Sequence, residues 1–288
     1  MEHRTVSLWN GTLAVTLDPL GAELTSVRCH GRERLWQNEN GSWAGHAPIL
    51  FPVCGMTAMR LGGRVYPCPR HGFARHALFE VAQQSETSVR FRLRSDDATP
   101  ALYPFAFSFD VVYTLLADAL LIAYEIRNDG DGVLYASCGG HDSFSLAGEV
   151  GEYALRFAAE ENFVHYPTDG DGRLTGETQL LGTGDVLDLS TPLLDGGGSI
   201  CLDHLRSREV TLFRRSSGGT VARVAFPDAE KLVLWHPEGS RMLCIEPWQT
   251  LPDTAGETLD FSGKDGVLSV LPGETRRVTR CITYGDGM

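Results

Sequence analysis

The sequence predicts an all-β protein with mainly antiparallel strands. Apolar and polar residues alternate with a period of two in many short segments, as they do in strands that bury one face. No segment carries a sustained apolar stripe of period 3.6 with helix caps, so at most a helical turn or two is expected. The 32 glycines and 14 prolines punctuate the spaces between the strand-like segments. Many short strands separated by turns are typical of a sandwich or a barrel.

The strand pattern starts near the N-terminus and recurs along the chain. Leucine and valine alternate with threonine and alanine over residues 12–17. Apolar residues alternate with arginines over residues 89–94, which predicts a strand with a basic outer face. Residues 107–116 and 120–126 flank a short Ala-Asp-Ala segment and predict a hairpin. Further strands are expected at residues 210–213, 221–226, 232–235, 242–245, 267–271 and 278–284.

The length and composition favour one folded unit over residues 1–288. Single β domains of more than 200 residues are common, and neither a repeat nor a linker rich in Ser or Pro divides this chain. The chain has 25 Lys and Arg against 37 Asp and Glu, a net charge of −12. An acidic chain repels a phosphate backbone and an anionic membrane surface. We therefore expect neither nucleic acid nor a membrane as partner, which leaves a small neutral molecule.

The N-terminal segment and the cysteines point to the cytoplasm. The N-terminus lacks the basic region and apolar stretch of a signal peptide, and the longest apolar run, around residues 119–124, is too short to cross a bilayer. The seven cysteines are odd in number and form no C-x-x-C pair, which is typical of buried thiols in a reducing compartment. A cytoplasmic monomer or homodimer is expected.

Three local clusters carry side chains suited to chemistry. The first, residues 69–76, holds Arg70, His71, Arg75 and His76 around a glycine. Arginine offers a rigid fork of donors to hydroxyl or phosphate groups, and histidine can hold or move a proton near neutral pH. The alternative is a solvated basic turn.

The second cluster, residues 138–144, places His141 after two glycines, and the third, residues 244–249, places Glu246 after an apolar strand. The glycines allow close backbone approach, so His141 can point into a cavity; the alternative is a hydrogen-bonded core histidine. A partly desolvated Glu246 has a raised pKa and can act as a general base; the alternative is a strand-end glutamate paired with arginine. Trp248 can face a sugar ring or belong to the core.

Metal binding and nucleophilic catalysis find little support in the sequence. It contains no H-E-x-x-H or H-x-H arrangement, and no set of cysteines and histidines has ligand spacing. No G-x-S-x-G elbow surrounds a serine. We therefore expect neither a metal nor a cofactor.

Taken together, the clusters resemble the aldose 1-epimerase (galactose mutarotase-like) family, and within it the LacX-like branch. The resemblance runs nearly end to end. Its most specific segments are A-P-I-L-F-P at residues 47–52, H-G-F-A-R at residues 71–75 and C-I-E-P-W at residues 244–248. Weaker matches are residues 10–11, 17–26, 35–37, Trp43, residues 139–141 and residues 271–274.

The resemblance implies a large antiparallel β-sandwich, the galactose mutarotase-like supersandwich, with few short helices. It also implies an isomerase that interconverts the α and β anomers of a hexose without metal or cofactor. By this resemblance Glu246 is the general base and His141 the general acid. His71 is a second active-site histidine, Asp203 falls where the family places a substrate-binding aspartate, and Arg75 belongs to the H-G-F-A-R motif near the sugar site.

One segment departs from the LacX-like pattern. The usual Gly-Arg that follows the Phe-Pro motif is missing, because Gly55 is followed by Met56. Arg60 or Arg64 is left to supply the arginine that binds a sugar hydroxyl. The preferred sugar therefore stays open.

Two other functions are compatible with the sequence. One is a hexose-6-phosphate 1-epimerase, because H-G-F-A-R occurs in that branch too and Arg70, Arg75 and Arg64 can clamp a phosphate. The other is a non-catalytic carbohydrate-binding protein of the same fold. The missing Gly-Arg indicates this alternative. A glycoside hydrolase fits less well, since it usually needs two carboxylates that flank the bond.

Overall fold

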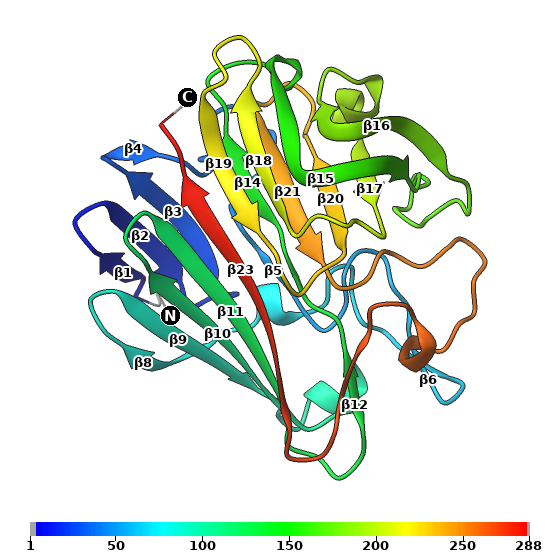
Figure 1. Ribbon diagram of the computed structural model, residues 1–288. Helices are drawn as coiled ribbons and strands as arrows, with labels where there is room; N and C mark the ends of the chain where they lie inside the picture. The colour runs from blue at the N-terminus through cyan, green and yellow to red at the C-terminus, as the bar shows by residue number, and fades with distance from the viewer. Residues whose placement is uncertain (1–3, 287–288) are drawn as a thin grey trace.

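The computed structural model describes residues 4–286, and its large antiparallel sheets confirm the all-β prediction (Figure 1). The main sheet contains β5 (Ile49–Leu50), β8 (Glu80–Gln84), β9 (Ser88–Arg94), β10 (Phe107–Leu115), β11 (Ala119–Asn128), β13 (Gly139–Gly140), β14 (Asp142–Ser145), β15 (Tyr153–His165), β16 (Gln179–Asp188), β17 (Ser199–Leu202), β18 (Glu209–Arg214), β19 (Thr220–Ala225), β20 (Lys231–Trp235), β21 (Met242–Trp248) and β23 (Thr275–Tyr284). Its strand order is β5-β13-β21-β20-β17-β15-β18-β19-β23-β11-β10-β9-β8, with β14 also on β21 and β16 on β15.

Three smaller sheets and five 3-10 helices complete the fold over residues 4–286. The first sheet contains β1 (Val6–Trp9), β2 (Leu13–Asp18), β3 (Glu23–Cys29) and β4 (Arg32–Glu33), and the two-stranded sheets pair β6 (Met59–Leu61) with β7 (Arg64–Tyr66) and β12 (Leu134–Ala136) with β22 (Leu268–Val270). The helices are η1 (Ala74–His76), η2 (Thr99–Ala101), η3 (Val150–Glu152), η4 (Pro192–Gly197) and η5 (Phe261–Gly263), which confirms the expectation of few short helices. None of the helices in the described part of the chain has the length and apolar character needed to cross a bilayer.

The strands predicted from alternation are present at the predicted places. Residues 12–17 correspond to β2 and residues 89–94 to β9. The predicted hairpin is β10 with β11, in which Leu115 pairs with Leu120. The six later segments correspond to β18 through β23.

The main hydrophobic core joins the first sheet to the main sheet. Leu17 of β2, Phe109 of β10 and Ile245 of β21 belong to one buried cluster. Phe51, next to β5, stacks on Phe109 with ring centroids 4.1 Å apart. The Tyr113 hydroxyl donates a hydrogen bond to the carbonyl oxygen of Ala22, so the core also fixes the turn between β2 and β3. This packing fixes β21, which carries Glu246, relative to the first sheet and to β10.

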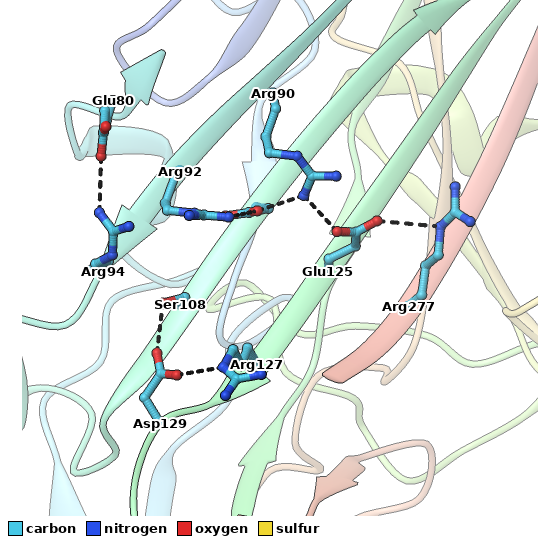
Figure 2. A network of polar contacts seen from close by, with 10 residues as sticks. Glu80, Arg90, Arg92, Arg94, Ser108, Glu125, Arg127, Asp129 and Arg277 are labelled. Carbon is cyan, nitrogen blue, oxygen red and sulfur yellow. Dashed lines mark hydrogen bonds and ion pairs between the residues drawn. The ribbon is translucent and has the colours of Figure 1, made fainter. Parts of the chain in front are cut away.

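The solvent face of β9 carries the predicted row of arginines, but acidic side chains neutralise it (Figure 2). Arg90 donates to Asp110 and to Glu125, each at 2.6 Å. Arg92 makes two hydrogen bonds to Asp110, and Arg94 pairs with Glu80. The predicted strand is therefore confirmed, whereas the predicted basic face is a network of ion pairs.

Candidate active site

The register of two strands places His141 opposite Glu246. The pairs Gly139 with Trp248 and Asp142 with Ile245 fix the alignment of β13 and β14 on β21, and His141 lies between them. Residues directly opposite in an antiparallel pair project to the same face, and their side chains touch. The Nε2 atom of His141 is accordingly 3.4 Å from Oε2 of Glu246. The pair expected to carry the chemistry thus forms as a cross-strand pair.

The face of the sheet that carries this pair lines a cavity of about 330 Å³. Glu246 is opposite Val233 on β20, and Val233 is opposite Cys201 on β17, so one row of side chains crosses three strands. Trp248 and Trp235 lie on the same face, because side chains alternate along a strand. All five side chains line the cavity with His141. A cavity of this volume lies within the usual range for small-molecule sites.

Two loops that carry the specific sequence segments interlock above this face. The amides of Phe73 and Ala74 both donate to the carbonyl oxygen of Phe51, at 3.1 and 3.2 Å. Gly72 has φ of 76°, and a Cβ atom there would lie 2.0 Å from that same oxygen. Only glycine satisfies both conditions. The A-P-I-L-F-P and H-G-F-A-R segments therefore form one unit that presents His71 to the cavity.

A backbone amide fixes the tautomer of His71. The N–H of Gly55 donates to Nδ1 of His71 at 3.1 Å, so Nδ1 is unprotonated and the neutral ring carries its hydrogen on Nε2. Burial, followed by the charges of His141 and Arg75, lowers the pKa of His71 well below its usual range. The ring lies edge-on to Trp248 and to His141, with centroids 5.4 and 5.6 Å apart. His71 is therefore a neutral hydrogen-bond donor at the cavity.

Burial disfavours the charged form of both members of the central pair. Glu246 is 1% exposed, and its pKa is raised well above the usual range by burial and then by the Asp142 charge. Burial lowers the pKa of His141 to about 3. The described structure leaves Nδ1 of His141 and Oε2 of Glu246 without a hydrogen-bond partner. Burial therefore favours the state of the pair in which Glu246 carries the proton and His141 is neutral.

Aromatic rings surround His141. Trp43 stacks on the imidazole with centroids 5.0 Å apart and an interplanar angle of 24°. Trp235 meets the imidazole edge-on at 5.6 Å. The Trp36 indole N–H donates to the carbonyl oxygen of Trp43 at 2.9 Å and anchors the loop that carries it. These rings exclude water from one side of the imidazole and give the cavity an aromatic wall.

The expected polar residues divide into two groups. Arg75 and also Arg70 line the cavity, and Arg70 is held by a hydrogen bond to the carbonyl oxygen of Asp171 at 2.9 Å. Asp203, just beyond β17, forms an ion pair with Lys231 at 3.1 Å. Arg60 lies on β6. Within residues 4–286 the cavity lining includes neither Asp203 nor Arg60, so their assignment to sugar binding stays a prediction.

Among the described residues two groups of three side chains have the spacing of a metal site, Cys29 with His30 and Asp286, and a second one that contains the central pair. His141, Cys244 and Glu246 each bring a potential ligand atom within 4.8 Å of the others. Burial raises the pKa of the Cys244 thiol well above its usual range, so the thiol stays protonated and is a poor metal ligand at neutral pH. The trio is better suited to proton transfer than to metal binding.

Sequence reasoning missed one residue that lines the site and two that lie behind it. Trp43 belonged to a weak motif and carried no predicted role. Asp142 follows His141 directly, but its partner Arg280 lies 138 residues further on, and no spacing in the sequence connects them. Arg280 was hidden in an alternating strand, where a cation is normally assigned to the solvent face.

Comparisons with known proteins identify the family. A model of the aldose 1-epimerase family matches residues 4–262. The chain is 32% identical to the chromosomal protein LacX of Lactococcus lactis subsp. lactis, over 97% of this chain and 99% of that protein. A galactose mutarotase-like protein from Lactobacillus casei is 26% identical, with a TM-score of 0.89 over 97% of this chain and 99% of that one. A galactose mutarotase related enzyme from Lactobacillus acidophilus is also 26% identical, with a TM-score of 0.90 over 99% of this chain and 98% of that one. With its cross-strand pair of His141 and Glu246 and its match over most of its length, the chain belongs to the aldose 1-epimerase family.

Proposed function

We propose that the protein is a mutarotase that interconverts the α and β anomers of a hexose by general acid and base catalysis. The observation that carries the proposal is the cross-strand pair in the cavity, with Nε2 of His141 3.4 Å from Oε2 of Glu246. Mutarotation needs one group at the anomeric hydroxyl and another at the ring oxygen, and both oxygens are bonded to the same carbon. Two neighbouring groups that share one proton meet this requirement.

Ring opening moves two protons. Glu246, as a carboxylate, takes the proton of the anomeric hydroxyl, and the electron pair of that O–H bond forms the carbonyl. The bond between C1 and the ring oxygen breaks, and its electron pair stays on the ring oxygen, which takes a proton from His141. The oxidation level of C1 is the same in the hemiacetal and the aldehyde, so the step balances without a redox partner.

Ring closure reverses the roles of the two residues. The aldehyde rotates about the C1–C2 bond and presents its other face. Neutral His141 takes the proton of the C5 hydroxyl as its oxygen attacks C1, and Glu246 protonates the carbonyl oxygen. The other anomer forms, and the pair returns to its starting state. The neutral pair in the middle of this cycle is the form that burial favours.

Bound sugar favours the ionised state in which the cycle starts. Hydroxyl groups that donate to a carboxylate stabilise its charge and lower its pKa. A sugar next to Glu246 therefore moves the shared proton to His141 across the 3.4 Å contact. His71 donates from Nε2 to a sugar hydroxyl, because its Nδ1 is occupied by the Gly55 amide. The aromatic wall formed by Trp43 and Trp235 keeps the reacting atoms away from bulk water.

Polarimetry on freshly dissolved α-D-glucose and α-D-galactose tests the proposal. The protein is expected to accelerate the approach to anomeric equilibrium with saturable kinetics. Saturable sugar binding without acceleration would show instead a carbohydrate-binding protein of the same fold. Neither binding nor acceleration with these sugars or their 6-phosphates would refute both functions.

A second candidate, a hexose-6-phosphate 1-epimerase, is favoured by the two arginines that line the cavity. Arg70 is exposed and Arg75 is half-buried, and each can donate two hydrogen bonds to a phosphate. The ratio of kcat/KM for glucose 6-phosphate and for glucose decides between the two functions. A phosphate epimerase loses this preference in Arg70→Gln and Arg75→Gln, whereas a mutarotase of free hexoses shows no preference to lose.

A further inference from the structure

A buried ion pair lies directly behind the chain segment that carries His141. Nε of Arg280, on β23, donates to Oδ2 of Asp142 at 2.7 Å, and Nη2 donates to Oδ1 at 3.1 Å. The two side chains are 3% and 0% exposed. Because side chains alternate along a strand, Asp142 points away from the cavity face that His141 occupies. Within the described residues no other ion pair has both side chains this deeply buried. The pair is therefore not a solvated surface contact.

Arg280 holds the chain on both sides of His141. On the C-terminal side it binds Asp142 with two hydrogen bonds. On the N-terminal side Nη1 donates to the hydroxyl oxygen of Tyr124, and that hydroxyl donates to the carbonyl oxygen of Gly139 at 3.2 Å. One guanidinium group thus fixes the residues that precede and follow the Gly140-His141 step.

The glycine before His141 makes this contact possible. A Cβ atom on Gly140 would lie 2.6 Å from Cζ of Arg280 and 2.7 Å from Oδ2 of Asp142. The backbone therefore packs directly against the ion pair. The carbonyl oxygen of Gly140 also accepts a hydrogen bond from the indole N–H of Trp248 at 3.2 Å. With these supports the His141 backbone has little freedom to move toward or away from Glu246.

The ion pair also sets the electrostatic environment of Glu246. The Asp142 carboxylate is the charged neighbour that raises the pKa of Glu246, next in effect to burial. The other titratable groups that interact with Glu246 are His141 and three thiols, which burial keeps neutral: Cys54, Cys201 and Cys244. Arg280 offsets the Asp142 charge, because an opposite charge within hydrogen-bond distance cancels most of its field at longer range.

We propose that Arg280 is a positioning residue for the reaction, which acts through Asp142 and Tyr124 to hold His141 at its distance from Glu246 and to neutralise the buried charge behind the pair. Arg280 and its two partners touch no part of the cavity, so they bind no sugar in this proposal. The inference rests on the proposed mutarotase function for its kinetic consequences. Its claim about the position of His141 does not depend on that function.

Removal of one hydroxyl tests the positioning role. Tyr124→Phe keeps both charges and the ring, but cuts the link from Arg280 to Gly139. We expect kcat to fall about tenfold, since a small displacement of a catalytic group has effects of this size, while KM stays within about twofold. The pH at which activity falls on the alkaline side should not change. An unchanged kcat would contradict the positioning role.

Removal of the charges tests the electrostatic role. Asp142→Asn leaves the positive charge of Arg280 uncompensated, and this charge lowers the pKa of Glu246. The pair then loses its shared proton at a lower pH. The alkaline limb of the kcat/KM profile therefore moves down by about one pH unit or more. In Asp142→Asn/Arg280→Gln both charges are absent, so the limb returns toward the wild-type pH while kcat stays low. The double variant also guards against an unpaired buried charge that prevents folding. A limb that stays in place in both variants would refute the electrostatic role.

A second ion pair, in which the aspartate is buried and the arginine is 31% exposed, provides the control. Asp110 is 4% exposed and binds Arg92 with two hydrogen bonds, but it lies on the outer face of β10 (Figure 2 shows Arg92). Asp110→Asn should lower stability and leave the pH profile and kcat of the remaining folded protein unchanged. A change in its profile equal to that of Asp142→Asn would show that the effect is general destabilisation.

One readout separates this inference from the proposed function. The imidazole nitrogens of His141 can be followed by NMR with 15N-labelled histidine, and the resonance can be assigned through His141→Asn. Tyr124→Phe and the double variant should shift this resonance, whereas Asp110→Asn should not. If the wild-type protein accelerates no mutarotation, the proposed function fails and the NMR result still decides the positioning role. An unshifted His141 resonance in both variants would overturn it.

Discussion

His141 and Glu246 lie opposite each other on neighbouring antiparallel strands, with Nε2 and Oε2 3.4 Å apart and the carboxyl group only 1% exposed. Their contact is a product of strand register, since it follows from the alignment of β13 and β14 with β21. Burial disfavours the charge on each member, so it favours the state in which one proton sits on Glu246 and His141 is neutral. The reaction proposed here uses that single proton in both directions.

Glu246→Gln is expected to lower kcat for mutarotation by about 10²- to 10⁴-fold, because an amide cannot take the proton of the anomeric hydroxyl. The fold should persist, since glutamine has nearly the same shape. Polarimetry measures the rate, and circular dichroism checks the fold. Glu80→Gln, at a side chain 60% exposed on the outer face, is the control and should keep full activity. A Glu246→Gln protein with more than a tenth of wild-type activity would remove this residue from the mechanism.

The contribution of Glu246 to the stability of the protein should fall as the pH rises above about 4.5, the ordinary pKa of glutamate. The folded-state pKa of Glu246 is raised, so the folded protein keeps a proton that the unfolded chain releases. The free energy of unfolding then falls by about 1.4 kcal/mol per pH unit until the pH passes the folded-state pKa. Glu246→Gln should lack this contribution. Urea unfolding of both proteins between pH 5 and pH 8 measures it, and identical slopes would contradict the raised pKa.

The acid side should show the opposite dependence for His141. Its folded-state pKa is lowered to about 3 from an ordinary value of 6.5, so the unfolded chain binds a proton that the folded protein does not. The stability contribution is therefore present above pH 6.5 and is lost as the pH falls toward 3. His141→Asn should weaken this acid sensitivity. Thermal unfolding of both proteins at pH 7 and pH 4 tests the point, and an equal loss of Tm in both would speak against a buried neutral His141.

Gly72→Ala should destabilise the protein by about 3 kcal/mol or more. The new Cβ atom would lie 2.0 Å from the Phe51 carbonyl oxygen, at a position with φ of 76°. Gly63→Ala is the matched control, because Gly63 has φ of 81° and no heavy atom within 4 Å of a built Cβ. That substitution should cost about 1–2 kcal/mol from the backbone conformation alone. Equal changes in urea midpoint would show that the interlock between the two loops contributes nothing.

Trp43→Ala should raise KM for the sugar about tenfold and also lower kcat, because the indole lines the cavity and stacks on His141. Trp43→Phe keeps an aromatic face and should recover most of the lost activity. Trp9→Ala, at a tryptophan that is 50% exposed, should behave like the wild type in the same kinetic assay. Unchanged kinetics in Trp43→Ala would exclude the loop that carries it from the site.

Most of the fold could be predicted because strands that bury one face show an alternation of apolar and polar residues in the sequence. The predicted segments from 12–17 to 278–284 all correspond to strands in the structure. β15 was missed because its middle, residues 158–162, consists of Ala, Glu and Asn, which are depleted in strands. Glu161 is buried there only because it accepts hydrogen bonds from the amides of Arg206 and Ser207. β16 was missed because it is largely exposed and contains Gly182 and Gly184.

The site could be predicted only in part, because some of its supporting residues stand in strands with an ordinary sequence pattern. His141, Glu246, His71 and Arg75 stand in short segments rich in unusual residues, and the structure brings all four to one cavity. The supports of His141 come from β11 and β23, which read as ordinary strands. A buried Arg280 is recognisable only when its partner is known, and the partner is distant in the sequence.

A double-mutant cycle on the central pair tests the account most directly. NMR exchange spectroscopy on glucose and galactose measures the anomerisation rate for the wild type, Glu246→Gln, His141→Asn and the double variant. If the two side chains share one proton in one mechanism, each single variant is as slow as the double variant. Losses that multiply in the double variant, or a single variant that keeps the wild-type rate, would contradict a joint role of His141 and Glu246.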